Sequence, residues 1–197
     1  MSDRRQRVLD AAIELFDERG YVGATADDIA ARAGVTKRTL YRYMGSKQHV
    51  LSEIHRNFLE AGFERWTAVV AEGGTARDML QRLISEHLRV VADFRGAIRV
   101  FFEEMKHLSP ADRAETVAQR DAYQKMLSDV IKAGQADGSF RAGDPEVMRL
   151  LILGALNEGY RWYEGDQMSD EALGEFVAKL VTNGLAARTN VATPAPR

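Results

Sequence analysis

Apolar residues recur at spacings of three and four positions along almost the whole chain, and no stretch alternates between apolar and polar residues for long enough to be a strand. The pattern predicts an all-α protein. A first helix spans about Asp3–Arg19 and ends at Gly20, because glycine favours helix C-termini. Two short helices follow, over about 26–33 and 36–43, and Gly34 lies in the turn between them. This arrangement is typical of a helix-turn-helix.

A fourth predicted helix begins at Ser46 and keeps one broad apolar stripe as far as Gly73, so it is long enough to connect two regions. The remaining segments predict a helical bundle, and we therefore divide the chain into a helix-turn-helix domain (1–50), an effector-binding and dimerisation domain (51–188) and a disordered tail (189–197). The later helices of the bundle are predicted to start at Thr75, about Gly96, Ser109, Asp144 and Ser169.

The composition of the 197 residues restricts the chemistry that the protein can perform. There is no cysteine, which excludes disulfides, thiol nucleophiles, zinc-thiolate sites and iron–sulfur clusters. Charge-free stretches reach only eight residues, as in Leu150–Asn157, whereas a membrane helix needs about 20. Acids such as Asp10 and Glu14 interrupt any N-terminal leader. We therefore expect a cytoplasmic protein without membrane association.

The net charge of −2 argues at first against a nucleic-acid partner, but the charge is unevenly distributed. Residues 1–56 contain ten basic and eight acidic residues, which gives +2 and leaves −4 for the rest. The segment 29–52 has no acid at all. Its five cations coincide with the helix-turn-helix and are Arg32, Lys37, Arg38, Arg42 and Lys47.

The third predicted helix carries the side chains that a reader of the DNA major groove needs. Arg and Lys bind phosphates and guanine edges, and Thr and Tyr hydroxyls bond to phosphate or base, while Leu40 is the one obvious core residue. A solvated cationic face is the alternative interpretation. Charge, aromatic residues and the helix-turn-helix coincide here, so we predict DNA binding.

At this point the chain resembles the N-terminal domain of TetR/AcrR-type transcriptional regulators, over about Arg4–Leu51. This resemblance implies a three-helix DNA-binding domain, an all-α effector domain and a homodimer. The residues that carry it are Ala11-Ala12, Leu15-Phe16, Gly20-Tyr21, Thr25, Ile29-Ala30, Ala33 to Lys37, Thr39 to Tyr41, Tyr43 and Ser46-Lys47.

The resemblance also implies roles for individual residues. Arg38 replaces the glycine common at its position, which alters the expected operator sequence because Arg adds a donor pair suited to guanine. Met44 replaces the usual phenylalanine and conserves its apolar character. The implied base-reading residues are Thr36, Lys37, Arg38 and Thr39, the implied phosphate contacts are Thr25, Tyr41, Tyr43 and Lys47, and Arg42 completes the predicted DNA-binding set.

One helix-turn-helix reads too few base pairs, so two copies related by a two-fold axis would bind a palindromic operator. The last two helices offer more apolar surface than one monomer is expected to bury. The alternative is that these residues are monomer core. The predicted dimer interface consists of Leu150, Leu153, Leu156, Leu173, Phe176, Val177, Leu180 and Val181.

The bundle also holds enough bulky residues to line an effector cavity. Segments 94–104 and 156–163 are similar to effector domains of the acyl-CoA-responsive subgroup, which controls fatty-acid or sterol-side-chain breakdown. The resemblance implies an apolar tunnel for the acyl chain and cations with a stacking ring for the nucleotide. The predicted ligand-binding residues are Trp66, His87, Arg95, Phe101, Phe102, Met105, Tyr123, Met126, Asn157, Tyr160, Arg161 and Trp162, with Arg99 as a further cation.

Other chemistry finds little support. Glu104 and His107 have the Glu-x-x-His spacing of di-iron bundles, but no second such pair exists, so we expect no metal site and no cofactor. No phosphate-binding loop or nucleophile elbow is present, which argues against an enzyme. We predict a homodimeric repressor released by a small molecule, with an acyl-CoA thioester as the first choice. A multidrug-type sensor and a DNA-binding dimer without an effector are the alternatives.

Overall fold

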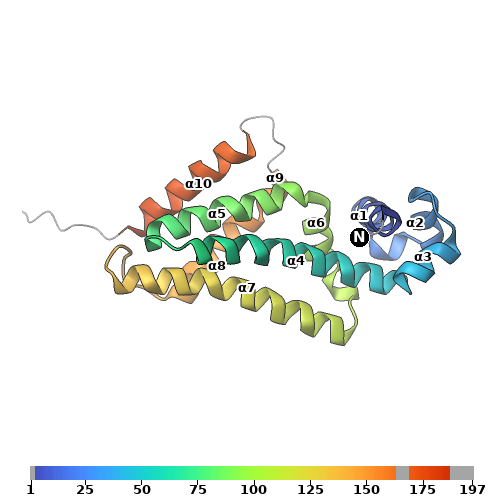
Figure 1. Cartoon of the computed structure of the whole chain (residues 1–197), viewed down its shortest axis with the longest axis horizontal. Helices are drawn as coiled ribbons and strands as arrows, with labels where there is room; N and C mark the ends of the chain where they lie inside the picture. Colours follow the sequence, from blue (N-terminus) through green and yellow to red (C-terminus); the bar gives the residue numbers. More distant parts are fainter. Residues whose placement is uncertain (1–2, 163–168, 187–197) are drawn as a thin grey trace, which may run out of the picture.

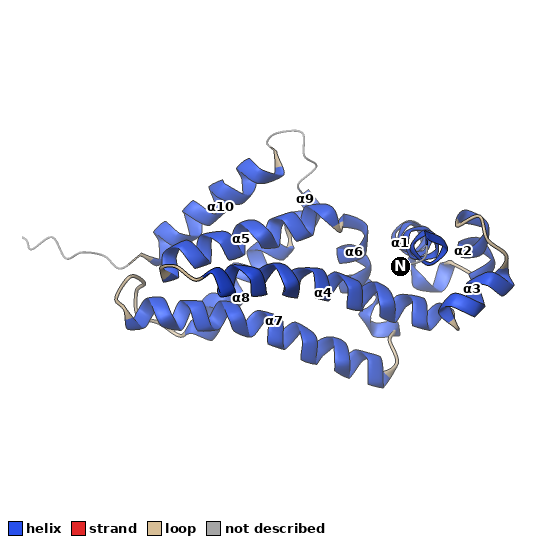
Figure 2. Cartoon of the chain, in the orientation of Figure 1, coloured by secondary structure: helices blue, strands red, loops and turns tan. Residues whose placement is uncertain are grey.

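The computed structural model describes residues 3–162 and 169–186, and over these residues the protein is all-α, as predicted (Figure 2). The predicted tail 189–197 lies outside them. The molecule is elongated, with helices α1 to α3 at one end and a helical bundle at the other (Figure 1). None of the described helices is long and apolar enough to cross a membrane.

Three helices form the N-terminal end, and their bounds are Asp3–Gly23 (α1), Ala26–Arg32 (α2) and Lys37–Met44 (α3). The predicted end of α1 at Gly20 is correct only in part. Gly20 leaves helical geometry with φ 71°, which glycine adopts without strain, and one more helical turn follows as far as Gly23. This kink turns the chain toward the N-terminus of α2.

Helix α4, Lys47–Glu72, connects the two ends of the molecule and crosses the predicted domain boundary at residue 50 (Figure 1). It packs against α1 and α3 at one end and against α5, α6 and α7 along its length. Ser46 caps its start by accepting a hydrogen bond from the His49 backbone, as the sequence predicts. A movement of α4 is therefore shared by both regions.

The predicted start signals of the bundle hold, because Thr75, Ser109, Asp144 and Ser169 each accept backbone N–H groups in the first turn of a helix. The predicted helix that starts at Asp144 is interrupted at Glu158. The bounds are Ala76–Asp93 (α5), Arg95–Glu104 (α6), the 3₁₀ turn Met105–His107 (η1), Pro110–Ala136 (α7), Pro145–Asn157 (α8), Gly159–Trp162 (α9) and Asp170–Leu185 (α10).

The apolar core has three parts. One part joins α1 to α4 with α6, a second fills the bundle, and a small third part around Phe58 and Phe101 connects them. Helix α6 packs directly on α1, where a β-carbon at Gly96 would lie 2.7 Å from the Ile13 side chain. The DNA-binding end and the bundle thus share continuous packing.

Candidate DNA-binding surface and effector cavity

Hydroxyl caps position the helix-turn-helix. Thr25 forms a complete capping box with Asp28: its hydroxyl accepts from the Asp28 backbone at 3.1 Å, and the Asp28 carboxylate accepts from the Thr25 backbone at 2.9 Å. Thr36 caps α3 by accepting from the Thr39 backbone at 3.1 Å. Leu40 and Met44 are fully buried and anchor α3 to the core. The opposite face of α3 is left for solvent or DNA.

The exposed face of α3 presents Arg38, Tyr41 and Arg42. Arg38 has no ion-pair partner among the residues that the structure describes. The Arg42 guanidinium lies 4.9 Å from the centre of the half-buried Tyr43 ring, a cation–π contact that orients the cation. These are the residue types that contact phosphates and base edges, and they share one surface.

Two of the five cations in the acid-free segment are neutralised by acids from neighbouring helices. Arg32 binds both carboxylate oxygens of Glu18, at 2.9 and 3.0 Å, and Glu14 at 3.1 Å, and these bonds raise the pKa of Arg32. Lys37 pairs with Asp27 at 2.8 Å, and this hydrogen bond raises the pKa of Lys37. The sequence count of five cations therefore overstates the positive charge of this surface.

Lys47 has a structural role that the sequence did not reveal. Its ammonium donates to the carbonyls of Tyr21 and Ala24, at 2.8 and 2.9 Å, and lies 4.1 Å from the centre of the Tyr21 ring. Burial lowers the pKa of Lys47. Two of its three donors thus hold the α1–α2 turn, and the predicted phosphate contact remains a prediction.

The bundle contains a narrow cavity of about 40 Å³ between α4, α5, α6, α7 and α8. It leaves room for little more than a water molecule, so a longer ligand requires its walls to move. Five predicted ligand residues line it: His87, Phe101, Phe102, Tyr123 and Asn157. Seven further lining residues were missed, because nothing in the local sequence links them: Phe58, Leu59, Gly62, Val90, Arg120, Gln124 and Leu153.

A chain of hydrogen bonds crosses the cavity wall from α7 through α5 to α8. His87 Nδ1 lies 2.8 Å from the Tyr123 hydroxyl, and His87 Nε2 lies 3.0 Å from Asn157 Oδ1. Burial lowers the pKa of His87 to about 4, so the imidazole is neutral at pH 7, and burial raises the pKa of Tyr123. These groups act as hydrogen-bonding partners of fixed protonation.

Several other predicted ligand residues lie around the cavity without lining it. Trp66 is fully buried, stacks on the Tyr123 ring at 4.0 Å and donates to the Leu83 carbonyl at 2.9 Å. Met126 packs against the bundle core, and Met105 packs against the two parts nearer to α1. They support the wall or the packing next to it.

The predicted cations are not gathered at the cavity. Arg99 of α6 pairs with Asp17 of α1 at 2.9 Å and so ties the bundle to the DNA-binding end. Arg161 is exposed and pairs with Glu158 at 3.4 Å. Arg95 is half-buried at the start of α6. The side chains of Tyr160 and Trp162 lie outside the described residues.

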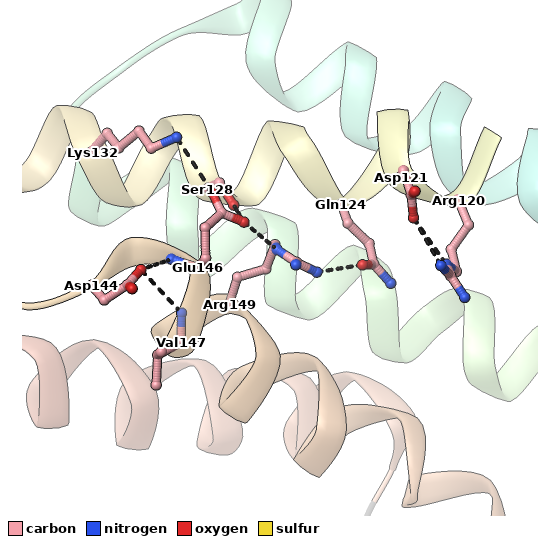
Figure 3. Close-up of polar contacts among 9 residues, drawn as sticks. All are labelled: Arg120, Asp121, Gln124, Ser128, Lys132, Asp144, Glu146, Val147 and Arg149. Atoms are coloured by element: carbon pink, nitrogen blue, oxygen red, sulfur yellow. Dashed lines mark hydrogen bonds and ion pairs between the residues drawn. The ribbon is translucent and has the colours of Figure 1, made fainter. Parts of the chain in front are cut away.

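Two polar residues of α7, Arg120 and Gln124, also line the cavity. Figure 3 shows that Arg149 of α8 donates to Gln124 Oε1 and pairs through Nε with Glu146 at 3.1 Å. Arg120 pairs with its exposed neighbour Asp121 at 2.9 Å. Two guanidinium groups therefore lie in this part of the lining or directly behind it.

The predicted dimer residues fall into three groups. Leu150, Phe176 and Leu180 are 59%, 58% and 63% exposed, and Leu151 of the same apolar run is 70% exposed. The dimer prediction is wrong for Leu153 and Leu156, because both are 3% exposed and pack in the core of the bundle. Partly buried positions of α10 complete the set and are Leu173, Val177 and Val181.

The pair Glu104 and His107 forms a contact of 3.4 Å, and no group of three metal-binding side chains occurs within the described residues. His107 also stacks on the Tyr21 ring, with the ring centres 5.1 Å apart. This pair therefore lies at the junction of η1 and α1.

Comparison with known proteins identifies the class. Residues 8–54 match the model of the bacterial regulatory proteins of the tetR family, and residues 73–185 match that of the tetracyclin repressor-like C-terminal domain. The chain belongs to the TetR family. It is therefore a DNA-binding transcriptional regulator with an N-terminal helix-turn-helix, and not an enzyme.

Within this family, the chain is similar to regulators whose names refer to steroid or fatty-acid metabolism. Over 96% of its length the chain is 30% identical to the HTH-type transcriptional repressor KstR2 of Rhodococcus jostii, of which it covers 94%. It is 27% identical to the fatty acid metabolism regulator protein of Bacillus subtilis, over 91% of this chain and 94% of that protein. The structure of the ketosteroid transcriptional regulator KstR2 of Mycobacterium tuberculosis matches with a TM-score of 0.88 and 25% identity, over 95% and 97% of the two chains.

Proposed function

We propose that the protein is a homodimeric repressor that binds a palindromic operator through α3 and releases it when an acyl-CoA thioester binds in the bundle. The exposed Arg38 and the ordered Arg42 supply the base and phosphate contacts. The relatives named a repressor and a fatty acid metabolism regulator support the repressor function and the acyl effector.

One observation supports the ligand class more than any other: an aromatic cavity that carries a polar chain in its wall. Phe58, Phe101 and Phe102 offer apolar contact to a hydrocarbon, and the Tyr123–His87–Asn157 hydrogen bonds lie beside them. An acyl thioester combines the same two kinds of surface, since a long apolar chain ends in a carbonyl.

The proposed signal passes from α6 to the DNA-binding end. Phe101 and Phe102 of α6 line the cavity, while Arg99 of the same helix pairs with Asp17 of α1. A ligand that moves α6 must therefore also move α1 or break this pair. Release requires that the ligand bind one domain arrangement more tightly than the other.

The proposal is tested by fluorescence anisotropy with the full chain and a palindromic DNA selected from a random library. Palmitoyl-CoA or octanoyl-CoA should release the DNA at micromolar concentrations, whereas free CoA and the free fatty acids should not. Release by cationic amphiphiles or aromatic drugs alone would identify a multidrug-type sensor. A bound complex that responds to none of these compounds would indicate a DNA-binding dimer without an effector.

A further inference from the structure

The hydrogen bonds in the cavity wall have a direction that the groups themselves determine. Asn157 Oδ1 can only accept, so His87 must donate to it from Nε2. The neutral imidazole then carries no proton on Nδ1, which accepts from the Tyr123 hydroxyl. Protons thus point from Tyr123 through His87 toward Asn157.

The series of hydrogen bonds ends at an amide donor that is not used within the part of the protein that the structure describes. The Asn157 side chain has two N–H groups on Nδ2, and none of the described residues accepts from them. Asn157 is half-buried and lines the cavity. Because His87 fixes Oδ1, the carboxamide cannot flip without losing its bond, so Nδ2 remains the amide atom that can donate to a ligand at this lining.

Three kinds of group meet in the lining around this donor. Phe58, Phe101 and Phe102 of α4 and α6 are apolar, Asn157 of α8 carries the donor, and Arg120 of α7 carries a positive charge. A ligand with an apolar tail, an internal acceptor oxygen and an anionic head offers a partner to each of the three kinds.

We infer that Asn157 reads the thioester carbonyl of the effector, with His87 holding its carboxamide in place and the head group leaving past Arg120. This inference rests on the proposed function and specifies how its ligand is recognised. A ligand without the carbonyl leaves the Asn157 donor unpaired in a half-buried site, which sites of this type penalise strongly.

Matched thioesters and thioethers test the inference by isothermal titration calorimetry on the full chain. Octanoyl-CoA and S-octyl-CoA, or palmitoyl-CoA and S-hexadecyl-CoA, differ at the carbonyl. The dissociation constant of the thioester should be lower than that of its thioether by a factor of about ten or more. Asn157→Leu should reduce this ratio to near one, while Gln6→Leu on the exposed side of α1 should keep it.

The outcomes separate the two proposals. Equal affinity of thioester and thioether in the wild type overturns the role of Asn157 but leaves an acyl-CoA effector, and so does an unchanged ratio in Asn157→Leu. If no CoA compound binds, the proposed effector class fails and this inference fails with it. The wild-type comparison remains decisive even if Asn157→Leu does not fold.

Discussion

His87 shows how burial fixes the chemistry of a single residue. It is 4% exposed and lies between Tyr123 and Asn157, and its pKa falls from 6.5 to about 4. A histidine in an apolar helix stripe predicts either a satisfied core group or a ligand donor. The structure combines the two, because His87 is satisfied on both nitrogens and thereby orients the group that faces the cavity.

This depressed pKa predicts a pH dependence of stability. The unfolded chain takes up a proton at His87 below about pH 6.5, whereas the folded protein resists it down to about pH 4, so falling pH favours unfolding in that window. Between pH 7 and pH 5 the wild type should lose about 2 kcal/mol more unfolding free energy than His87→Phe. Urea titrations at both pH values measure this difference, and parallel losses in the two proteins would contradict the buried neutral histidine.

At the scale of elements, the sequence predicted where helices begin better than it predicted which residues meet between helices. Capping residues such as Thr36 and Ser109 mark helix starts because they act within one turn. The break at Glu158 had no such signal. The cavity lining comes from five helices, and its residues are therefore distant in sequence. Phe101 and Phe102 were predicted because they are aromatic residues in an apolar helix stripe. Gly62 and Arg120 were not predicted, because nothing in the sequence around them indicates a cavity.

Ion pairs between helices were not predicted either, because their partners are also distant in sequence. The acid-free segment 29–52 looked strongly cationic, but Glu18 and Asp27 reach it from α1 and α2. Arg99, predicted as a nucleotide contact, pairs with α1 instead. Such partners are distant in sequence, and the packing of α1 against α2 and α6 and of α2 against α3 brings them together.

The α1–α2 turn provides a prediction at this scale. Lys47→Ala removes two charge-assisted hydrogen bonds to the Tyr21 and Ala24 carbonyls, so the free energy of unfolding should fall by about 1–3 kcal/mol. Lys179→Ala serves as the control, because its exposed pair with Glu175 on α10 contributes little. Urea unfolding compares them, and equal stabilities of the two variants would show that Lys47 does not hold the turn.

At the scale of the whole molecule, the monomer leaves apolar side chains uncovered on its last long helices. Leu151, Phe176 and Leu180 are each more than half exposed on α8 and α10. Large exposed apolar side chains on neighbouring elements mark interaction surfaces. We propose that a second copy of the chain covers them, as a palindromic operator requires.

Leu180→Glu tests this surface. A carboxylate at this position must be desolvated in the interface, so the variant should sediment and scatter light as a monomer where the wild type is a dimer. Val22→Glu serves as the control, because this side chain is 74% exposed in the last turn of α1, far from α8 and α10. This variant should stay dimeric. A dimeric Leu180→Glu would locate the interface on a different face.

The proposed mechanism requires that an acyl-CoA in the bundle change the spacing of the two DNA-binding ends in the dimer. Because the natural sequence has no cysteine, Asp10→Cys on the exposed side of α1 places one spin label in each protomer. Pulsed electron–electron double resonance then measures the distance between the two labels in the free, operator-bound and palmitoyl-CoA-bound protein. The operator should select one distance, compatible with recognition helices about 34–36 Å apart, and palmitoyl-CoA should shift the distribution away from it while free CoA does not. If protein saturated with palmitoyl-CoA gave the same distance distribution as the free protein, release of DNA through a change of spacing would be ruled out.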